Sequence, residues 1–148
     1  MEGASFRLEK VLRYRAHLEK KVRLQVCQAV TRMKEQEALV GRLGDQRAEA
    51  ARDLARERSG GIPVYRDQIR TSFLRRLTES LTEAHGELEQ RRETLELLKT
   101  LLTLATRKKK GLESLKEAHL RRFMEAAEKK EQKLLDELVM IRRERQGL

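Results

Sequence analysis

The stretch Ser59-Gly60-Gly61-Ile62-Pro63 interrupts a chain whose residue pattern is otherwise helical from end to end. It joins two glycines to the only proline among the 148 residues. Glycine commonly ends a helix because it tolerates a left-handed backbone, and proline suits a helix start, where its missing N–H is not needed. The stretch therefore predicts a turn over residues 59–63 between two helices.

The residues before this turn predict one long helix over about 5–58. Apolar or tolerable residues recur there at alternating steps of four and three, which is the seam of a left-handed coiled coil. Two consecutive steps of four, from Leu18 through Val22 to Val26, indicate a stutter that locally unwinds the supercoil. The expected seam residues are Leu8, Val11, Arg15, Leu18, Val22, Val26, Ala29, Met33, Gln36, Val40, Leu43, Arg47, Ala50 and Leu54.

The residues after the turn predict a second helix over about 64–145. The patterns Ser80-x-x-Glu83 and Ser114-x-x-Glu117 match a capping box, which raises the alternative of an internal break. Such matches arise often by chance, so we expect the helix to be continuous. The expected seam residues are Leu77, Leu81, Ala84, Leu88, Arg91, Leu95, Leu98, Leu102, Ala105, Leu112, Leu115, His119, Phe123, Ala127, Leu134, Leu138 and Ile141.

Together these helices predict an all-α fold, a long antiparallel two-helix coiled-coil hairpin that forms a single domain over residues 1–148. Charged residues make up 39% of the chain and aromatic residues 3%, a composition that disordered chains share. The helical spacing of Leu, Val, Ala and Met favours a coiled coil instead. Because a short turn folds two helices back on each other, the N-terminus should lie beside residues near 120. About 25 C-terminal residues should then overhang as a single amphipathic helix.

The formal net charge of +10 is divided unevenly along the chain. Residues 1–58 hold 14 basic and 9 acidic side chains, residues 59–106 hold 7 of each, and residues 107–148 hold 13 and 8. In an antiparallel hairpin, the excess positive charge gathers on the half that carries both termini. A basic surface attracts acidic proteins, nucleic acids or membrane surfaces, so the two ends of the hairpin should meet different partners.

No arrangement of side chains in the sequence suits catalysis or cofactor binding. His17, His85 and His119 are far apart, whereas a metal site on a helix needs ligands about one turn from each other. Cys27 has Arg23 one turn away, but an inert role beside the seam is favoured over a reactive one. We interpret the protein as a non-enzyme with no cofactor, no metal and no small-molecule substrate.

The run Arg107-Lys-Lys-Lys110 is the densest basic segment of the chain. It is compatible with a phosphate or acidic-surface contact. A solvated helix face is the favoured interpretation, because no aromatic residues are interleaved for base stacking. Binding to nucleic acid is therefore not the expected function.

Aromatic residues are scarce, and two of the five lie just after the turn, at Tyr65 and Phe73. Phe73 and Leu77 are one helical turn apart and so share a face. The spacing leaves two interpretations equally open. Phe73 is either a first seam contact of the hairpin or an exposed anchor for a partner.

The sequence contains no sign of membrane insertion or secretion. No apolar stretch approaches the roughly 20 residues of a spanning helix. Residues 1–6 lack the apolar core of a signal peptide, and a lone cysteine is no disulfide framework. We expect a cytoplasmic protein.

Two segments resemble the FliJ family of flagellar export proteins. The start, Phe6-Arg-Leu-Glu-Lys-Val-Leu-Arg-Tyr-Arg15, is similar to the Phe-x-Leu-x-x-Leu-type opening of that family. The residues Leu112-Glu-Ser-Leu-Lys-Glu-Ala-His119 through Lys130-Glu-Gln-Lys-Leu-Leu-Asp-Glu137 resemble its C-terminal helix. The middle of the chain matches in pattern only, and it departs from the family in the Gly-Gly-Ile-Pro turn and the extra leucines near 95–104.

The resemblance implies a non-catalytic component of the flagellar type III export apparatus, peripheral at the cytoplasmic face of the cell membrane when bound. It implies binding to the export ATPase hexamer in the manner of a central stalk, contact with the cytoplasmic domain of the export gate, and escort of substrate chaperones. Early residues of the second helix, Phe73 and Leu77, match the family's gate contact. The residues carried over to the ATPase contact are Arg7, Arg13, Arg15, Glu131, Gln132, Asp136 and Glu137.

Two other hypotheses remain open from the residues alone. One is a basic coiled coil that binds nucleic acid, whose affinity would fall steeply with salt. The other is a structural coiled coil that dimerises through the wide leucine stripe between Leu95 and Leu104. We expect the free protein to be a monomer.

Overall fold

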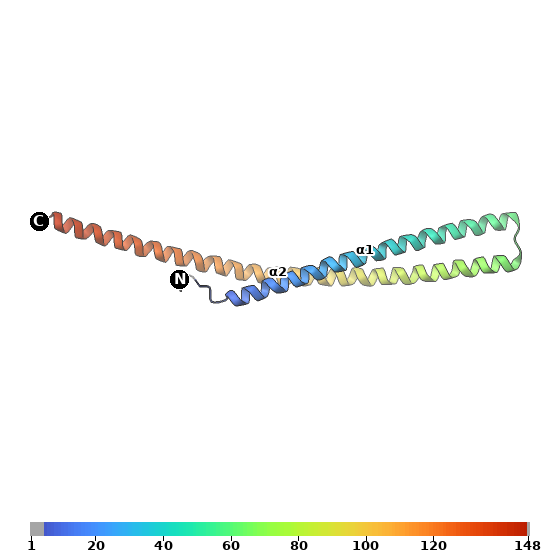
Figure 1. The fold of residues 1–148 in the computed structure, drawn as a ribbon, viewed down its shortest axis with the longest axis horizontal. Helices are drawn as coiled ribbons and strands as arrows, with labels where there is room; N and C mark the ends of the chain where they lie inside the picture. The colour runs from blue at the N-terminus through green and yellow to red at the C-terminus, as the bar shows by residue number, and fades with distance from the viewer. Residues whose placement is uncertain (1–4, 148) are drawn as a thin grey trace. The chain divides into compact units, whose positions relative to one another are not determined.

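The protein consists of two long α-helices, as seen in a computed structural model that describes residues 5–147 (Figure 1). Helix α1 spans Glu9–Gly60 and helix α2 spans Val64–Gln146. No strand occurs within the described range. The predicted all-α fold is confirmed, although α1 begins four residues later and ends two residues later than the sequence predicted, and the turn is correspondingly shorter.

Packing divides the chain into two units. The turn unit comprises residues 21–102, and the terminal unit comprises residues 1–20 together with 103–148. Each unit contains a segment of both helices, so each has its own helix–helix interface. The organisation as a single domain stays a prediction.

The turn between the helices is built from one left-handed glycine and one proline. Gly61 has a φ of 79°, the conformation that glycine adopts without the steric cost of a side chain. Its N–H donates to the Arg58 carbonyl at 3.3 Å, which closes the C-terminus of α1. The carbonyl of Pro63 accepts from the N–H groups of Arg66 and Asp67, both at 3.1 Å, and so begins α2.

A two-point ion pair fastens the two helix ends beside this turn. Arg58 donates through Nε to Asp67 Oδ2 at 2.7 Å and through Nη2 to Oδ1 at 3.1 Å. The hydrogen bond from Arg58 lowers the pKa of the Asp67 carboxyl, and it raises the pKa of Arg58 in turn. Arg70, which follows Asp67 by three residues on α2, pairs with Glu57 at 2.6 Å.

In the turn unit, the two helices pack antiparallel along the predicted seam. Its polar seam residues are accommodated by bonds that reach the opposite helix. Gln36 is buried and donates to the Ala84 carbonyl at 3.0 Å, while Arg91 donates to the Arg32 carbonyl at 3.0 Å. Arg47 donates to the Thr78 hydroxyl at 3.0 Å. The buried apolar residues of this unit are Ala29, Leu54, Ala84, Leu88 and Leu95.

In the terminal unit, the start of the chain packs against the middle of α2. The ring of Phe6 lies 5.8 Å from that of His119, centroid to centroid. Lys116 Nζ lies 3.0 Å from Glu9 Oε2, and Lys109 pairs with Glu19. The prediction that the N-terminus lies beside residues near 120 is confirmed.

The predicted stutter in α1 is wrong. Leu12 and Glu19 are buried, whereas Val11 is exposed. Alternating steps of three and four therefore run without interruption from Leu12 through Arg15 and Glu19 to Val22. The predicted seam took the apolar Leu18 in place of its neighbour Glu19, and this choice created the apparent stutter.

The corresponding correction applies to α2, where the seam was placed on Leu115. Leu115 is exposed, and the half-buried positions are Lys109, Leu112, Lys116, His119 and Phe123. Two lysines thus occupy seam positions opposite two glutamates. The interface of the terminal unit therefore combines two unexpected charge pairs with apolar residues such as Leu12 and Leu112.

Helix α2 continues beyond its contacts with the N-terminal segment. Every described residue from 124 to 147 is exposed, and the helix runs on to Gln146 without a break at Ser80 or Ser114. The predicted single-helix overhang is therefore confirmed, and we call residues 124–147 the C-terminal overhang. Within the range described, neither helix has a segment long and apolar enough to cross a membrane.

Candidate functional site

The C-terminal overhang (Figure 1, orange to red) has an apolar face that no other residue in the range 5–147 covers. Leu134 and Leu138 are 61% and 62% exposed, and Ile141 is 48% exposed. Their steps of four and three place the three side chains on one face of the helix. Leu135 and Val139 widen this face on one side, and both are about half exposed. An apolar stripe of this kind normally packs against another apolar surface.

The four polar residues predicted on this segment are also exposed. They are Glu131, Gln132, Asp136 and Glu137, and Gln132 donates to Asp136 at 3.3 Å. All four carry side chains available to a partner.

The arginines predicted for the same contact lie in the N-terminal segment of the terminal unit, which packs against α2. Arg7 and Arg13 are exposed, and Arg15 is half-buried. Arg13 makes only a long contact with Glu9, at 3.8 Å. Phe6 packs at His119, and Glu131 lies twelve residues farther along α2, roughly 18 Å away at 1.5 Å per residue. The two predicted sets therefore form two neighbouring patches and not one cluster.

A buried ion pair between Glu19 and Lys109 fixes how the α1 and α2 segments of the terminal unit align. The Glu19 side chain is only 2% exposed, and that of Lys109 is 25% exposed. Glu113, one turn along α2, lies 3.9 Å from the same ammonium. Sequence reasoning missed both members of this pair. Counting the seam upstream from Val22 in steps of three and four would have found Glu19.

This pair changes the interpretation of the basic run at residues 107–110. Lys109 belongs to the helix interface, and Arg107, Lys108 and Lys110 remain exposed. A continuous row of four free cations, which a phosphate contact would use, is therefore not present there. The basic run at residues 107–110 therefore gives less support to the nucleic-acid hypothesis.

Beside the turn, Phe73 and Leu77 border a shallow groove of the turn unit. Leu77 is half-buried in the seam, while Phe73 flanks the seam and is 47% exposed. The two interpretations left open by the spacing thus apply to different residues. Leu77 is a seam contact and Phe73 is an exposed aromatic side chain. The other residues that line the groove are Gln46, Glu49, Ala50, Asp53 and Arg70.

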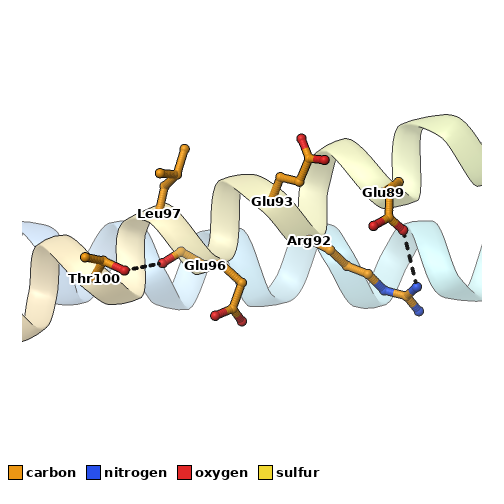
Figure 2. A pocket seen from close by; sticks show the side chains of 6 residues that line it. All are labelled: Glu89, Arg92, Glu93, Glu96, Leu97 and Thr100. Atoms are coloured by element: carbon orange, nitrogen blue, oxygen red, sulfur yellow. Dashed lines mark hydrogen bonds and ion pairs between the residues drawn. The ribbon is translucent and has the colours of Figure 1, made fainter.

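A second shallow hollow lies on α2 alone, and Figure 2 shows the six side chains around it. Glu93 and Leu97 project on the same side of the helix, while Arg92 extends the other way toward Glu89. Arg92 also lies 3.5 Å from Glu37 of α1. The expected wide leucine stripe is thereby divided, because Leu95 is buried in the seam and Leu97 is 68% exposed.

No group of three or more His, Cys, Asp or Glu side chains that could hold a metal ion occurs within residues 5–147. The Nε2 atom of His119 is buried and has no hydrogen-bond partner, and its ring contacts Phe6. Cys27 is exposed.

Comparison with protein families gives one match along nearly the whole chain. A family described as the flagellar FliJ protein matches residues 4–148. Comparison with curated proteins and with solved structures gave no match.

Proposed function

Since the chain belongs to the flagellar FliJ protein family, and is therefore a component of flagellar protein export, we propose that it acts as a non-catalytic stalk of the export ATPase. In this proposal, the terminal unit binds the ATPase hexamer. The turn unit contacts the cytoplasmic domain of the export gate, and the protein also escorts substrate chaperones. It works at the cytoplasmic face of the cell membrane when bound to the apparatus.

The observation that supports the ATPase contact is the uncovered C-terminal overhang. A single amphipathic helix gains little stability from its own hydrogen bonds in water, and most helical stability comes from packing of the apolar face. Leu134, Leu138 and Ile141 present such a face over about two turns. Insertion into the channel of a ring would cover it from several sides at once.

Charge supports the same end of the protein. The terminal unit includes the exposed arginines Arg7 and Arg13, and beyond them the acidic residues Glu131, Asp136 and Glu137. A partner that contacts both patches needs acidic and basic groups at separate heights along the helix. Such an arrangement favours one axial position of the stalk, because like charges face each other when it slides.

The gate contact is proposed at the groove of the turn unit. Phe73 offers an exposed ring and Leu77 the apolar floor, and aromatic residues in shallow pockets are frequent anchors of protein interfaces. The groove lies in a different unit from the ATPase contact. The two partners should therefore bind without competing.

A deletion tests the ATPase assignment. Removing residues 124–148 takes away the overhang and leaves Glu19–Lys109 and Phe6–His119 in place, so the rest of the terminal unit should fold. We expect the truncated chain to lose binding to the purified export ATPase and to lose any stimulation of ring assembly or ATP turnover.

The matched control is Phe73→Ala, which should retain ATPase binding and lose affinity for the cytoplasmic domain of the gate. Circular dichroism should show that both variants remain helical. Full ATPase binding by the truncated chain would overturn the assignment to the overhang. An intact chain that neither binds nor stimulates a correctly folded ATPase would overturn the stalk proposal itself.

A further inference from the structure

One exposed face of the turn unit has no part in the contacts described so far. It follows α2 from Glu79 to Leu101 in steps of three and four, so its members form a single row along the helix. All of them are exposed, and none occupies a seam position. We call this row the outer α2 face, and it consists of Glu79, Glu83, Gly86, Gln90, Glu93, Leu97 and Leu101.

The charge of this face is of one sign. It holds three glutamates and no basic residue, although the whole chain carries a net charge of +10. None of the three glutamates forms an ion pair with another residue in the range 5–147. The neighbouring Glu89 and Glu96, by contrast, lie 3.8 Å and 3.5 Å from Arg92 and Lys99. The acidic groups of the row are therefore available to an external cation.

The apolar end of the row is equally unused by the fold. Leu97 is 68% exposed and Leu101 is 51% exposed, and they lie one turn apart. Glu93 precedes Leu97 by one turn and projects on the same side of α2 (Figure 2). A single exposed leucine is ordinary on a protein surface, but two in line with an acidic row form a patterned patch.

We propose that the outer α2 face binds a basic amphipathic helix of a partner protein. Leu97 and Leu101 would pack against apolar side chains of that helix, and Glu79, Glu83 and Glu93 would pair with its lysines or arginines. The face spans 22 residue steps, roughly 33 Å, which fits a partner helix of about 20 residues. Nucleic acids and anionic membranes are poor occupants, because the face would repel their phosphates.

The predicted contact has a recognisable physical character. Only two leucines are available for burial, so the interface is small and its affinity modest, in the range of transient complexes. The charges speed association and set specificity, so binding should weaken as salt rises. This surface is separate from the ATPase and gate contacts proposed above and does not depend on either.

A defined peptide tests the inference on the full chain. The probe is a fluorescent 20-residue helix with leucine at positions i, i+3, i+4 and i+7 and lysine at most others. Two controls are a scrambled peptide of the same composition and a peptide with glutamate in place of lysine. We expect the basic helix to bind with a micromolar Kd in fluorescence anisotropy, and at least tenfold more tightly than either control.

Matched variants locate the site. The double variant Leu97→Ser with Leu101→Ser should weaken peptide binding at least tenfold, and Glu93→Lys should weaken it about threefold and reduce its salt dependence. The controls are Leu24→Ser and Glu35→Lys, which change an exposed leucine and an exposed glutamate of α1 and should leave binding unchanged. Equal binding of the scrambled peptide, or equal losses in the control variants, would overturn the proposal.

Sedimentation equilibrium separates a heterologous partner from a second copy of this chain. We expect the free chain and the double leucine variant to have the same mass in solution. A dimer that the double variant converts to a monomer would show that a second copy occupies the face, and would overturn the proposal. ATPase and gate binding by the double variant should be normal, so failure here and failure of the stalk proposal are distinguishable.

Discussion

The turn unit and the terminal unit each pack α1 against α2, but different kinds of residue form the two interfaces. In the turn unit, buried Leu88 and Leu95 lie in the seam. The polar seam residues of this unit donate hydrogen bonds to backbone carbonyl or hydroxyl groups of the opposite helix. In the terminal unit, the deepest seam residue is Glu19, paired with Lys109. Apolar contacts tolerate many alignments of two helices, whereas a buried charge tolerates only the alignment that brings its partner.

This difference gives the two units different tasks. The turn unit supplies most of the apolar burial, and so it is where stability should be concentrated. The terminal unit gains less from burial, but its ion pairs specify which residues of α1 and α2 face each other. Accurate alignment of the two helices matters most where a partner must recognise residues from both of them.

The largest expected effect comes from the seam of the turn unit. Leu88→Ala removes a buried side chain and should lower the free energy of unfolding by about 3 kcal/mol. Urea denaturation followed by circular dichroism measures this change. The control Leu97→Ala alters an exposed leucine of the same helix and should change stability by less than about 0.5 kcal/mol. Equal losses in the two variants would show that the seam is not where burial matters.

An intermediate effect is expected from the ion pair of the terminal unit. Glu19→Ala leaves Lys109 without its buried partner and should cost about 2 kcal/mol, less than the roughly 3–5 kcal/mol of a fully buried pair because Lys109 is partly exposed. Hydrogen exchange should quicken in residues 9–20 and 109–119 and not near the turn.

A double variant sharpens this test. Glu19→Leu combined with Lys109→Leu should restore or increase stability, since apolar residues often replace a buried ion pair without loss. We expect it also to weaken the specificity with which α1 and α2 align. Disulfide trapping between cysteines placed on the two helices would then detect several registers. A single register in the double variant would show that other contacts fix the alignment.

The smallest effect concerns pH at the turn. The hydrogen bond from Arg58 lowers the pKa of Asp67 below its ordinary value, so Asp67 contributes stability above its unfolded pKa of about 4 and loses that contribution as pH falls through the folded pKa. The Arg58 side chain is exposed and that of Asp67 is half-buried, so solvent screens the pair and the change in stability should be slight. NMR titration should place the Asp67 midpoint below that of other exposed aspartates.

The matched variant Arg58→Gln should return the Asp67 midpoint to the ordinary range. A titration that is the same with and without Arg58 would show that the pair does not persist in solution.

The fold was largely predictable from the sequence, and the reason is local chemistry. Gly61 and Pro63 specify one turn, and the spacing of Leu, Val and Ala specifies two helices with a common seam. The misplaced stretch lies in the terminal unit, where the seam contains Glu19 and Lys109. A charged residue resembles a surface residue when it is judged by type, and only its position in the repeat distinguishes it.

The candidate contacts were harder to predict, because a surface for an absent partner and a surface for water use the same residues. Phe73 illustrates the limit. Its spacing was compatible with the seam and with exposure, and its exposed ring became evident only from the packing of Leu77 beside it. The residues assigned to the ATPase contact on the C-terminal overhang were predicted from the resemblance alone, and that assignment stays a prediction.

The sequence separation of the pairs also fixes an order in time. Arg58 and Asp67 are nine residues apart, so their contact is available as soon as the turn has left the ribosome. Lys116 and Glu9 are separated by 107 residues, which a ribosome adds in roughly 5 to 20 s. The segment around Glu9 must therefore wait until Lys116 has been synthesised before this pair can form. We expect the terminal unit to be completed last, so that a chain halted during synthesis lacks the end proposed to bind the ATPase.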